Sequence, residues 1–170
     1  MARTGILVST GLILAAAMAA PALAEGEPHE HGHATMQIAV EGNTLSVALE
    51  LPGDDAVGFE TEPSTDEDRA ALAEAKEKLA DPLAVLDLPE AAGCVAGESA
   101  SEYHVEGEHA AMEVEYELNC ENVAAIETLG TRLFELFPSV EEVEVEYALP
   151  SGQGGGELSP GAAAIELPAV

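Results

Sequence analysis

The chain of 170 residues contains 33 Asp and Glu residues but only five Lys and Arg residues, which gives a formal net charge of −28 at pH 7. A surface this acidic argues against anionic partners, both nucleic acid and anionic membranes, and it raises the local concentration of cations. The sequence has no Trp, three Tyr and three Phe, which argues against an aromatic-lined site for an organic ligand.

The first 24 residues have the pattern of a signal peptide. Arg3 precedes an apolar run over residues 5–20, and the small residues Ala22 and Ala24 mark a cleavage site for signal peptidase. The apolar run is shorter than the ~20 residues that span a bilayer, which favours a cleaved signal over a membrane anchor. We therefore expect a periplasmic protein that begins at Glu25 and has no stable membrane insertion after signal cleavage.

Two cysteines, Cys94 and Cys120, occur in the sequence. In an oxidising compartment this even count predicts a disulfide bond between them. A buried pair of free thiols or a thiolate metal site is the alternative. The spacing is not C-x-x-C, which argues against a redox-active pair.

A polar, histidine-containing leader is expected over residues 25–34, followed by a single domain over residues 35–170. Apolar residues occupy every second position over 36–40 and again over 45–51. Gly42-Asn43 supplies turn residues between these two runs. The pattern predicts a β-hairpin at the start of the domain.

The later patterns predict further helices and strands. A helix is expected over 65–80, with a capping box from Ser64 to Glu67 at its start. The remaining predicted elements are strands over 102–105, 110–120 and 143–149, a short helix over 131–137, and short edge strands from the Gly-rich segment 151–156 and the apolar tail 162–167. This order predicts an α+β fold, in which one longer helix and one or two short helices pack on a mainly antiparallel β-sheet.

Five histidines are the candidate metal ligands, because imidazole is the commonest zinc ligand. They are His29, His31, His33, His104 and His109. The first three are spaced by two residues, so in an extended chain they share one side. All five fall on the polar side of the strand patterns, and the leader histidines would converge with His104 or His109 if the first strand lay near strand 110–120. The alternative is that these histidines are exposed and unconnected.

Residues 29–33 also satisfy the letters H-E-x-x-H. In zinc proteases this motif lies on a helix that directs the Glu at a metal-bound water. Here Pro28 precedes the segment, Gly32 interrupts it, and a strand pattern follows. We interpret the match as coincidental and do not expect the protein to be an enzyme.

An ordered series of short segments resembles the ZrgA-type periplasmic zinc uptake proteins. These segments are His29-Glu30-His31-Gly32, Ile38-Ala39-Val40-Glu41-Gly42-Asn43, Gly58-Phe59-Glu60, Ala92-Gly93-Cys94, His109 with Tyr116 and Cys120, Leu133-Phe134 with Phe137-Pro138, and Leu149-Pro150 with Gly152-Gln153. No single segment is specific, and the ordered set, which covers nearly the whole mature chain, carries the resemblance.

The resemblance implies a protein that binds zinc in the periplasm and assists a high-affinity zinc importer by buffering or delivering the ion. His29, His31 and His109 match positions of the family, and His33 is a common addition. Many members carry a long His/Asp-rich stretch before the position of His109, which here shrinks to residues 103–108. This departure argues against storage of many ions.

Two alternatives remain open at the level of the sequence. The protein can instead be a periplasmic interaction or scaffold module whose exposed histidines are incidental. Imidazole also suits nickel and copper, so the residues alone do not select zinc.

Overall fold

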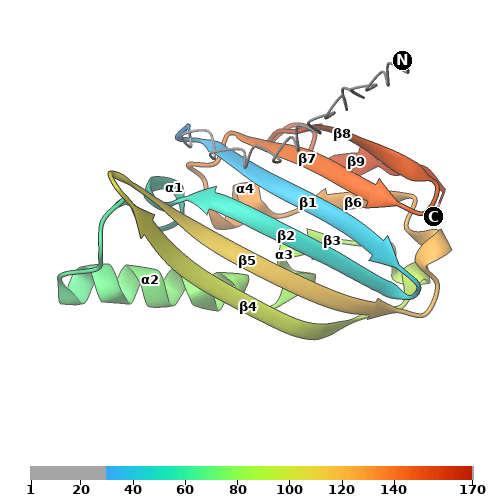
Figure 1. Cartoon of the computed structure of the whole chain (residues 1–170), viewed down its shortest axis with the longest axis horizontal. Coiled ribbons are helices and arrows are strands. Elements are labelled where there is room, and N and C mark those ends of the chain that lie inside the picture. Colours follow the sequence, from blue (N-terminus) through green and yellow to red (C-terminus); the bar gives the residue numbers. More distant parts are fainter. Residues whose placement is uncertain (1–29, 170) are drawn as a thin grey trace, which may run out of the picture.

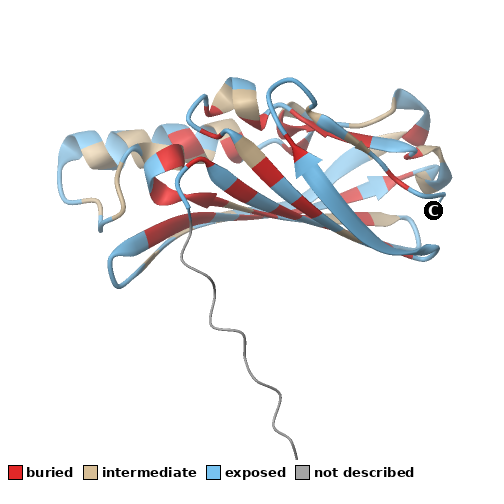
Figure 2. Ribbon diagram, turned by 90° about the horizontal axis from the view of Figure 1, so that it is seen from above, coloured by how far each residue is buried: buried red, intermediate tan, exposed pale blue. Residues whose placement is uncertain are grey.

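A curved six-stranded β-sheet forms one layer of the molecule, and helices and a three-stranded sheet cover one of its faces (Figures 1 and 2). The structure, a computed structural model, describes residues 30–169. The expected signal peptide over 1–24 and the candidate ligand His29 lie outside the described residues. No helix within 30–169 is long and apolar enough to cross a bilayer.

In chain order the elements are β1 (His33–Glu41), β2 (Thr44–Pro52), α1 (Gly53–Val57), α2 (Asp66–Leu79), α3 (Pro82–Val85), β3 (Leu86–Asp87), η1 (Glu90–Ala92), β4 (Cys94–Glu106), β5 (His109–Cys120), η2 (Val123–Ala125), β6 (Thr128–Thr131), α4 (Leu133–Leu136), β7 (Glu142–Leu149), β8 (Gly152–Leu158) and β9 (Ala164–Glu166). The expected α+β class is confirmed.

The larger sheet has the strand order β4-β5-β2-β1-β7-β8, and the smaller sheet has the order β3-β6-β9. Strands β1 and β2 form the expected hairpin, with Gly42 at a positive φ of 61° in the turn. Strands β1 and β7 pair in parallel, whereas the other paired strands of the two sheets are antiparallel. Strand β2 therefore lies between β1 and β5, so the first strand is not a direct neighbour of strand β5.

The alternation of apolar and polar residues assigns one face of the larger sheet to the core. In β1 every second residue from Ala34 to Val40 is buried, and the intervening residues are exposed. In β5 the hydroxyl of buried Tyr116 donates a hydrogen bond of 2.8 Å to the carbonyl oxygen of Leu79, at the end of α2. The inner face thus packs under the helices, and the polar residues are left on the outer face (Figure 2).

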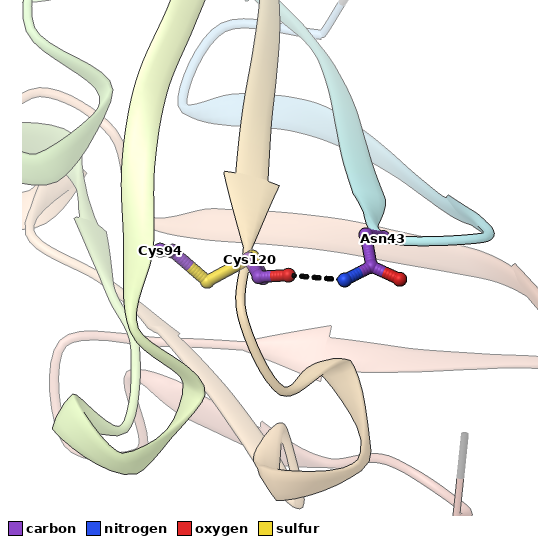
Figure 3. The surroundings of a disulfide bond; sticks show 3 residues. All are labelled: Asn43, Cys94 and Cys120. Carbon is purple, nitrogen blue, oxygen red and sulfur yellow. Dashed lines mark hydrogen bonds between the residues drawn. A yellow bond between two sulfur atoms is a disulfide. The ribbon is translucent and has the colours of Figure 1, made fainter.

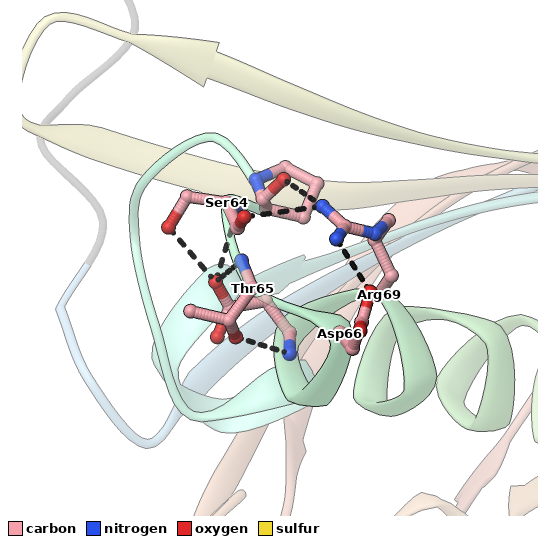
Figure 4. Close-up of polar contacts among 6 residues, drawn as sticks. Ser64, Thr65, Asp66 and Arg69 are labelled. Carbon is pink, nitrogen blue, oxygen red and sulfur yellow. Dashed lines mark hydrogen bonds and ion pairs between the residues drawn. The ribbon is translucent and has the colours of Figure 1, made fainter.

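Helix α2 is the one longer helix expected from the sequence. Its capping box lies one residue later than expected, because Thr65 rather than Ser64 is the N-cap and Asp68 rather than Glu67 completes the box. The Thr65 side chain accepts from the amide of Asp68 at 3.0 Å, and the Asp68 carboxylate accepts from the amide of Thr65 at 2.8 Å (Figure 4). The same carboxylate also accepts from the amide of Ser64. Hydrogen bonding of the Asp68 carboxylate, first to the Thr65 side chain and then to the amides of Thr65 and Ser64, lowers its pKa to about 2.

The expected disulfide between Cys94 and Cys120 is present (Figure 3). The two cysteines are paired directly across β4 and β5, at the end of the sheet where β5 finishes. The Asn43 side chain donates to the carbonyl oxygen of Cys120 at 3.0 Å, which joins the β1–β2 turn to the same point.

Removing this disulfide should destabilise the fold. For cysteines separated by 26 residues, the loss of loop-closure entropy in the unfolded chain is worth about 3.5 kcal/mol. We expect the variant with both Cys94→Ser and Cys120→Ser to lose about this much in urea unfolding. Asn43→Ala, which removes only the neighbouring hydrogen bond, should lose about 1 kcal/mol. Equal unfolding curves for the double-serine variant and the parent would contradict this account.

Candidate metal site

The candidate site lies at the end of the larger sheet where β1 begins, β2 ends and β5 begins (Figure 1). The register pairs Pro52 at the end of β2 with Ala111 near the start of β5. Helix α1 follows β2 directly and packs against β5. Residues from three distant parts of the chain therefore meet at one edge of the molecule.

Glu60 is the centre of this group. Its Oε1 lies 3.4 Å from Nε2 of His31, and its Oε2 lies 3.8 Å from Nδ1 of His109. The Glu60 side chain is only 16% exposed, whereas His31 and His109 are 59% and 49% exposed. One nearly buried carboxylate thus lies between two histidines that are accessible to solvent.

The segment that carries Glu60 is held in place by Tyr103 of β4. The Tyr103 hydroxyl donates to the carbonyl oxygen of Phe59 at 2.7 Å, and the two rings make an edge contact with centroids 5.7 Å apart. Burial, with a smaller effect from nearby Glu60, raises the pKa of Tyr103 to about 12. The hydroxyl therefore remains a hydrogen-bond donor across the neutral range and fixes the backbone next to Glu60.

His31 is held from the other side by α1. Its Nδ1 lies 3.4 Å from Oδ2 of Asp54, and the amide of the next residue, Gly32, donates to Oδ2 of Asp55 at 2.6 Å. Asp55 is buried, and this desolvation raises the pKa of its carboxyl, while the Gly32 amide acts in the opposite direction. The contact of Asp54 with Nδ1 leaves Nε2 of His31 directed at Glu60.

The other two described histidines lie elsewhere on the outer face. Nδ1 of His33 is 3.4 Å from Oε1 of Glu142, its register partner on β7. Nε2 of His104 is 3.1 Å from Glu102 and 3.5 Å from Glu113. Among the contacts made within 30–169, none connects either histidine to Glu60.

The structure thus brings His31 and His109 to one carboxylate, Glu60, whereas His33 and His104 lie beside other carboxylates. His31 lies in a turn before β1, where Gly32 has a φ of 83°, so the spacing of two does not place His31 and His33 on one strand face. Turn and strand conformations over residues 31–33 also differ from the helix that an H-E-x-x-H protease motif requires.

Residues of this kind suit a metal ion. Glu60 Oε1 is buried and, among the described residues, has no hydrogen-bond donor, although a buried polar atom usually has one. In a tetrahedral zinc site with ligand bonds of about 2.0–2.1 Å, neighbouring ligand atoms are about 3.3 Å apart. The distance of 3.4 Å from His31 to Glu60 Oε1 is near this value, and the distance of 3.8 Å from His109 to Glu60 Oε2 is longer. Within 30–169, however, no three His, Cys, Asp or Glu side chains already converge closely enough to hold a metal ion, so the three groups would have to draw together around it.

Sequence reasoning missed Glu60, Asp54 and Asp55 as parts of this group. Glu60 belongs to Gly58-Phe59-Glu60, one of the segments that carry the family resemblance. That segment was the available signal, because composition alone does not distinguish one carboxylate among 33 acidic residues.

Comparison with known proteins gives a consistent result. The sequence model described as "ZrgA family zinc uptake protein" matches residues 28–167, nearly the whole chain. No curated protein matches the chain at a significant level.

A carboxylate that serves a metal rather than the fold should be dispensable in the metal-free protein. At pH 8, where imidazole is neutral, Glu60→Gln should leave the free energy of unfolding unchanged or raise it by up to about 1 kcal/mol, because a desolvated charge is removed. Urea unfolding in the presence of a chelator measures this change. The control is Glu142→Gln, which contacts His33 at the surface and should have no effect. A loss above about 1 kcal/mol for Glu60→Gln would show that Glu60 stabilises the fold itself.

Proposed function

This chain belongs to the ZrgA family of zinc uptake proteins, and we propose that it binds Zn²⁺ through His31, Glu60 and His109 as cargo for a zinc importer. The observation that carries the proposal is the position of Glu60, whose two carboxylate oxygens each face an imidazole nitrogen. The two histidines are 78 residues apart in the sequence, and the fold brings both to one carboxylate.

The proposed ligand set matches the preferences of zinc. Zinc takes imidazole nitrogen and carboxylate oxygen in sites of three protein ligands, with a further position for water or another group. A carboxylate at the second ring nitrogen of a ligating histidine fixes the ring, as Asp54 does at Nδ1 of His31. His29, two residues before His31 and outside the described residues, is the predicted additional ligand.

The exposure of the site supports a role in binding and release. His31 and His109 are each about half exposed, so the ion would be open to exchange with a partner. A site whose histidines were buried would instead favour permanent retention. Buffering or delivery to a high-affinity importer is therefore the role we propose, with the importer taken from the family's function in zinc uptake.

The proposed location is the periplasm. The expected signal peptide leads to export, and the Cys94–Cys120 disulfide suits an oxidising compartment. We propose no catalytic activity, because the H-E-x-x-H letters lie in a turn and a strand over their described part, 30–33.

Zinc titration of the mature protein and its variants tests this function. His31→Ala and His109→Ala should each weaken Zn²⁺ binding by more than about a hundredfold, because even outer-shell partners are worth 10–100-fold. The double variant should lose little more than either single variant, since both residues bind the same ion. Competition with a chromogenic chelator measures the dissociation constants.

His33→Ala and His104→Ala are the matched controls and should bind Zn²⁺ like the parent, since both histidines contact other carboxylates. If all four single variants bind like the parent, zinc is not held at Glu60, and the interaction-module alternative gains support. If the two control variants lose binding as strongly as the other two, the site is elsewhere on the outer face.

Zinc binding should also weaken in acid. Each ligating imidazole must lose its proton to bind, and imidazole ordinarily titrates near pH ~6.5. With two histidines, affinity should fall about a hundredfold between pH 7.5 and pH 5.5. Competition titrations at both pH values measure the change. An unchanged affinity would indicate a site formed from carboxylates alone.

A further inference from the structure

Gly32 lies between His31 and His33, and the rest of the protein holds its backbone on both sides. Its amide donates to Asp55 Oδ2 at 2.6 Å, and its carbonyl oxygen accepts from the amides of Glu141 and Glu142 at 2.7 and 2.9 Å. Its φ of 83° lies in the left-handed region, which turns the chain between the two histidines. The position of His31 is therefore set by contacts that its neighbour makes.

Asp55 is the buried partner in this arrangement. It is 7% exposed, whereas its helix neighbour Asp54 remains accessible at the side chain of His31. The backbone carbonyl of Asp55 accepts from the Ser139 hydroxyl at 3.0 Å, which secures α1 independently of the carboxylate. Burial disfavours the charged form of Asp55, and the Gly32 amide offsets part of that cost. The carboxylate is thus placed where its hydrogen bond with the Gly32 amide fixes the turn that carries His31.

We propose that Asp55 is the positioning residue of the zinc site, because its carboxylate holds the Gly32 amide and so keeps His31 directed at Glu60 before the ion arrives. The inference rests on the proposed function. Asp55 makes no hydrogen bond or ion pair with His31, Glu60 or His109 in the contacts of the described residues. Apart from the electrostatic effect between its carboxylate and His31, it acts through its hydrogen bond to the turn. A ligand held in its bound position loses less conformational freedom on binding, which raises affinity.

Two properties of Asp55 can be separated by substitution. Asp55→Asn keeps a carbonyl oxygen that can accept from the Gly32 amide but removes the charge. Asp55→Ala removes both. Ser139→Ala is the matched control, since it removes the hydrogen bond to the backbone carbonyl of Asp55 and leaves the carboxylate on Gly32.

The experiment measures the Zn²⁺ dissociation constant of each variant by chelator competition at pH 7.5, with the melting temperature of the zinc-free form. Asp55→Ala should weaken Zn²⁺ binding about tenfold or more, in the range seen for outer-shell residues. The dissociation constant of Asp55→Asn should stay within about threefold of the parental value, because the hydrogen bond to Gly32 is kept; removal of such a partner usually costs at least about tenfold. Ser139→Ala should bind Zn²⁺ like the parent. The visible absorption of bound Co²⁺ should be weaker in Asp55→Ala than in the parent and should have parental strength in Asp55→Asn. A loss of fold stability alone would not change the absorption of the bound ion in this way.

Parental affinity in Asp55→Ala would overturn the inference. Equal weakening in Asp55→Asn and Asp55→Ala would also overturn it, because the charge rather than the hydrogen bond would then matter. If Asp55→Ala fails to fold, Gly32→Ala replaces it, since a side chain at a φ of +83° strains the same turn while Asp55 remains. Gly32→Ala should show the same tenfold weakening, and parental affinity there would overturn the inference. If the parent binds no Zn²⁺, the proposed function itself is wrong. If the parent binds Zn²⁺ and Asp55→Ala binds it equally well, only the positioning role of Asp55 is wrong.

Discussion

The alternation of apolar and polar residues along the strands of the larger sheet is the constraint on which the rest of the structure depends. It places the apolar side chains of β1, β2, β5 and β7 under the helices and leaves most of the intervening residues on the outer face. A slip of one residue in any of these strands would turn glutamates and histidines into the core, which fixes the register strongly. The same register brings the start of β5 beside the end of β2, and α1, which follows β2 at once, carries Asp54 and Asp55 to the turn before β1. The His31–Glu60–His109 group is therefore a consequence of strand pairing.

The outer face is also the electrostatic environment of that group. None of the six strands of the larger sheet contains Lys or Arg, and the four such residues within 30–169 are in α2 or just before α4: Arg69, Lys76, Lys78 and Arg132. Glu113 of β5 has Glu102 and Glu50 as its register partners on the two neighbouring strands, and Glu144 pairs with Glu157. Like charges placed opposite one another are unfavourable, and cations near the face relieve that repulsion. The negative electrostatic potential of this face raises the local concentration of divalent cations. The histidines on the same face prefer some of these cations to others as ligands.

Much of this architecture could be predicted because half-buried strands have a period of two. Strands β2, β5 and β7 were expected within one or two residues of their bounds, and β1 begins three residues earlier than expected. Strand β4 extends back to Cys94, but residues 95–100 are exposed, so no alternation marked that part. Helix α1 has five residues and no side-chain cap, and no sequence pattern predicted it. Glu60 could not be singled out because its importance comes from burial beside Tyr103 and from two histidines distant in sequence, which are tertiary facts. The grouping of His31 with His33 was expected from spacing, and the left-handed turn at Gly32 separates them.

The zinc site that we propose consists of Glu60, His31 and His109, and the two histidines are 78 residues apart in the sequence. Anomalous diffraction at the zinc absorption edge, from crystals of the zinc-loaded mature protein, tests this most directly. The proposed site should give a strong anomalous peak within bonding distance of Nε2 of His31, Nδ1 of His109 and the Glu60 carboxylate. A peak at His33 and Glu142, or among His104, Glu102 and Glu113, with no peak at Glu60, would contradict it.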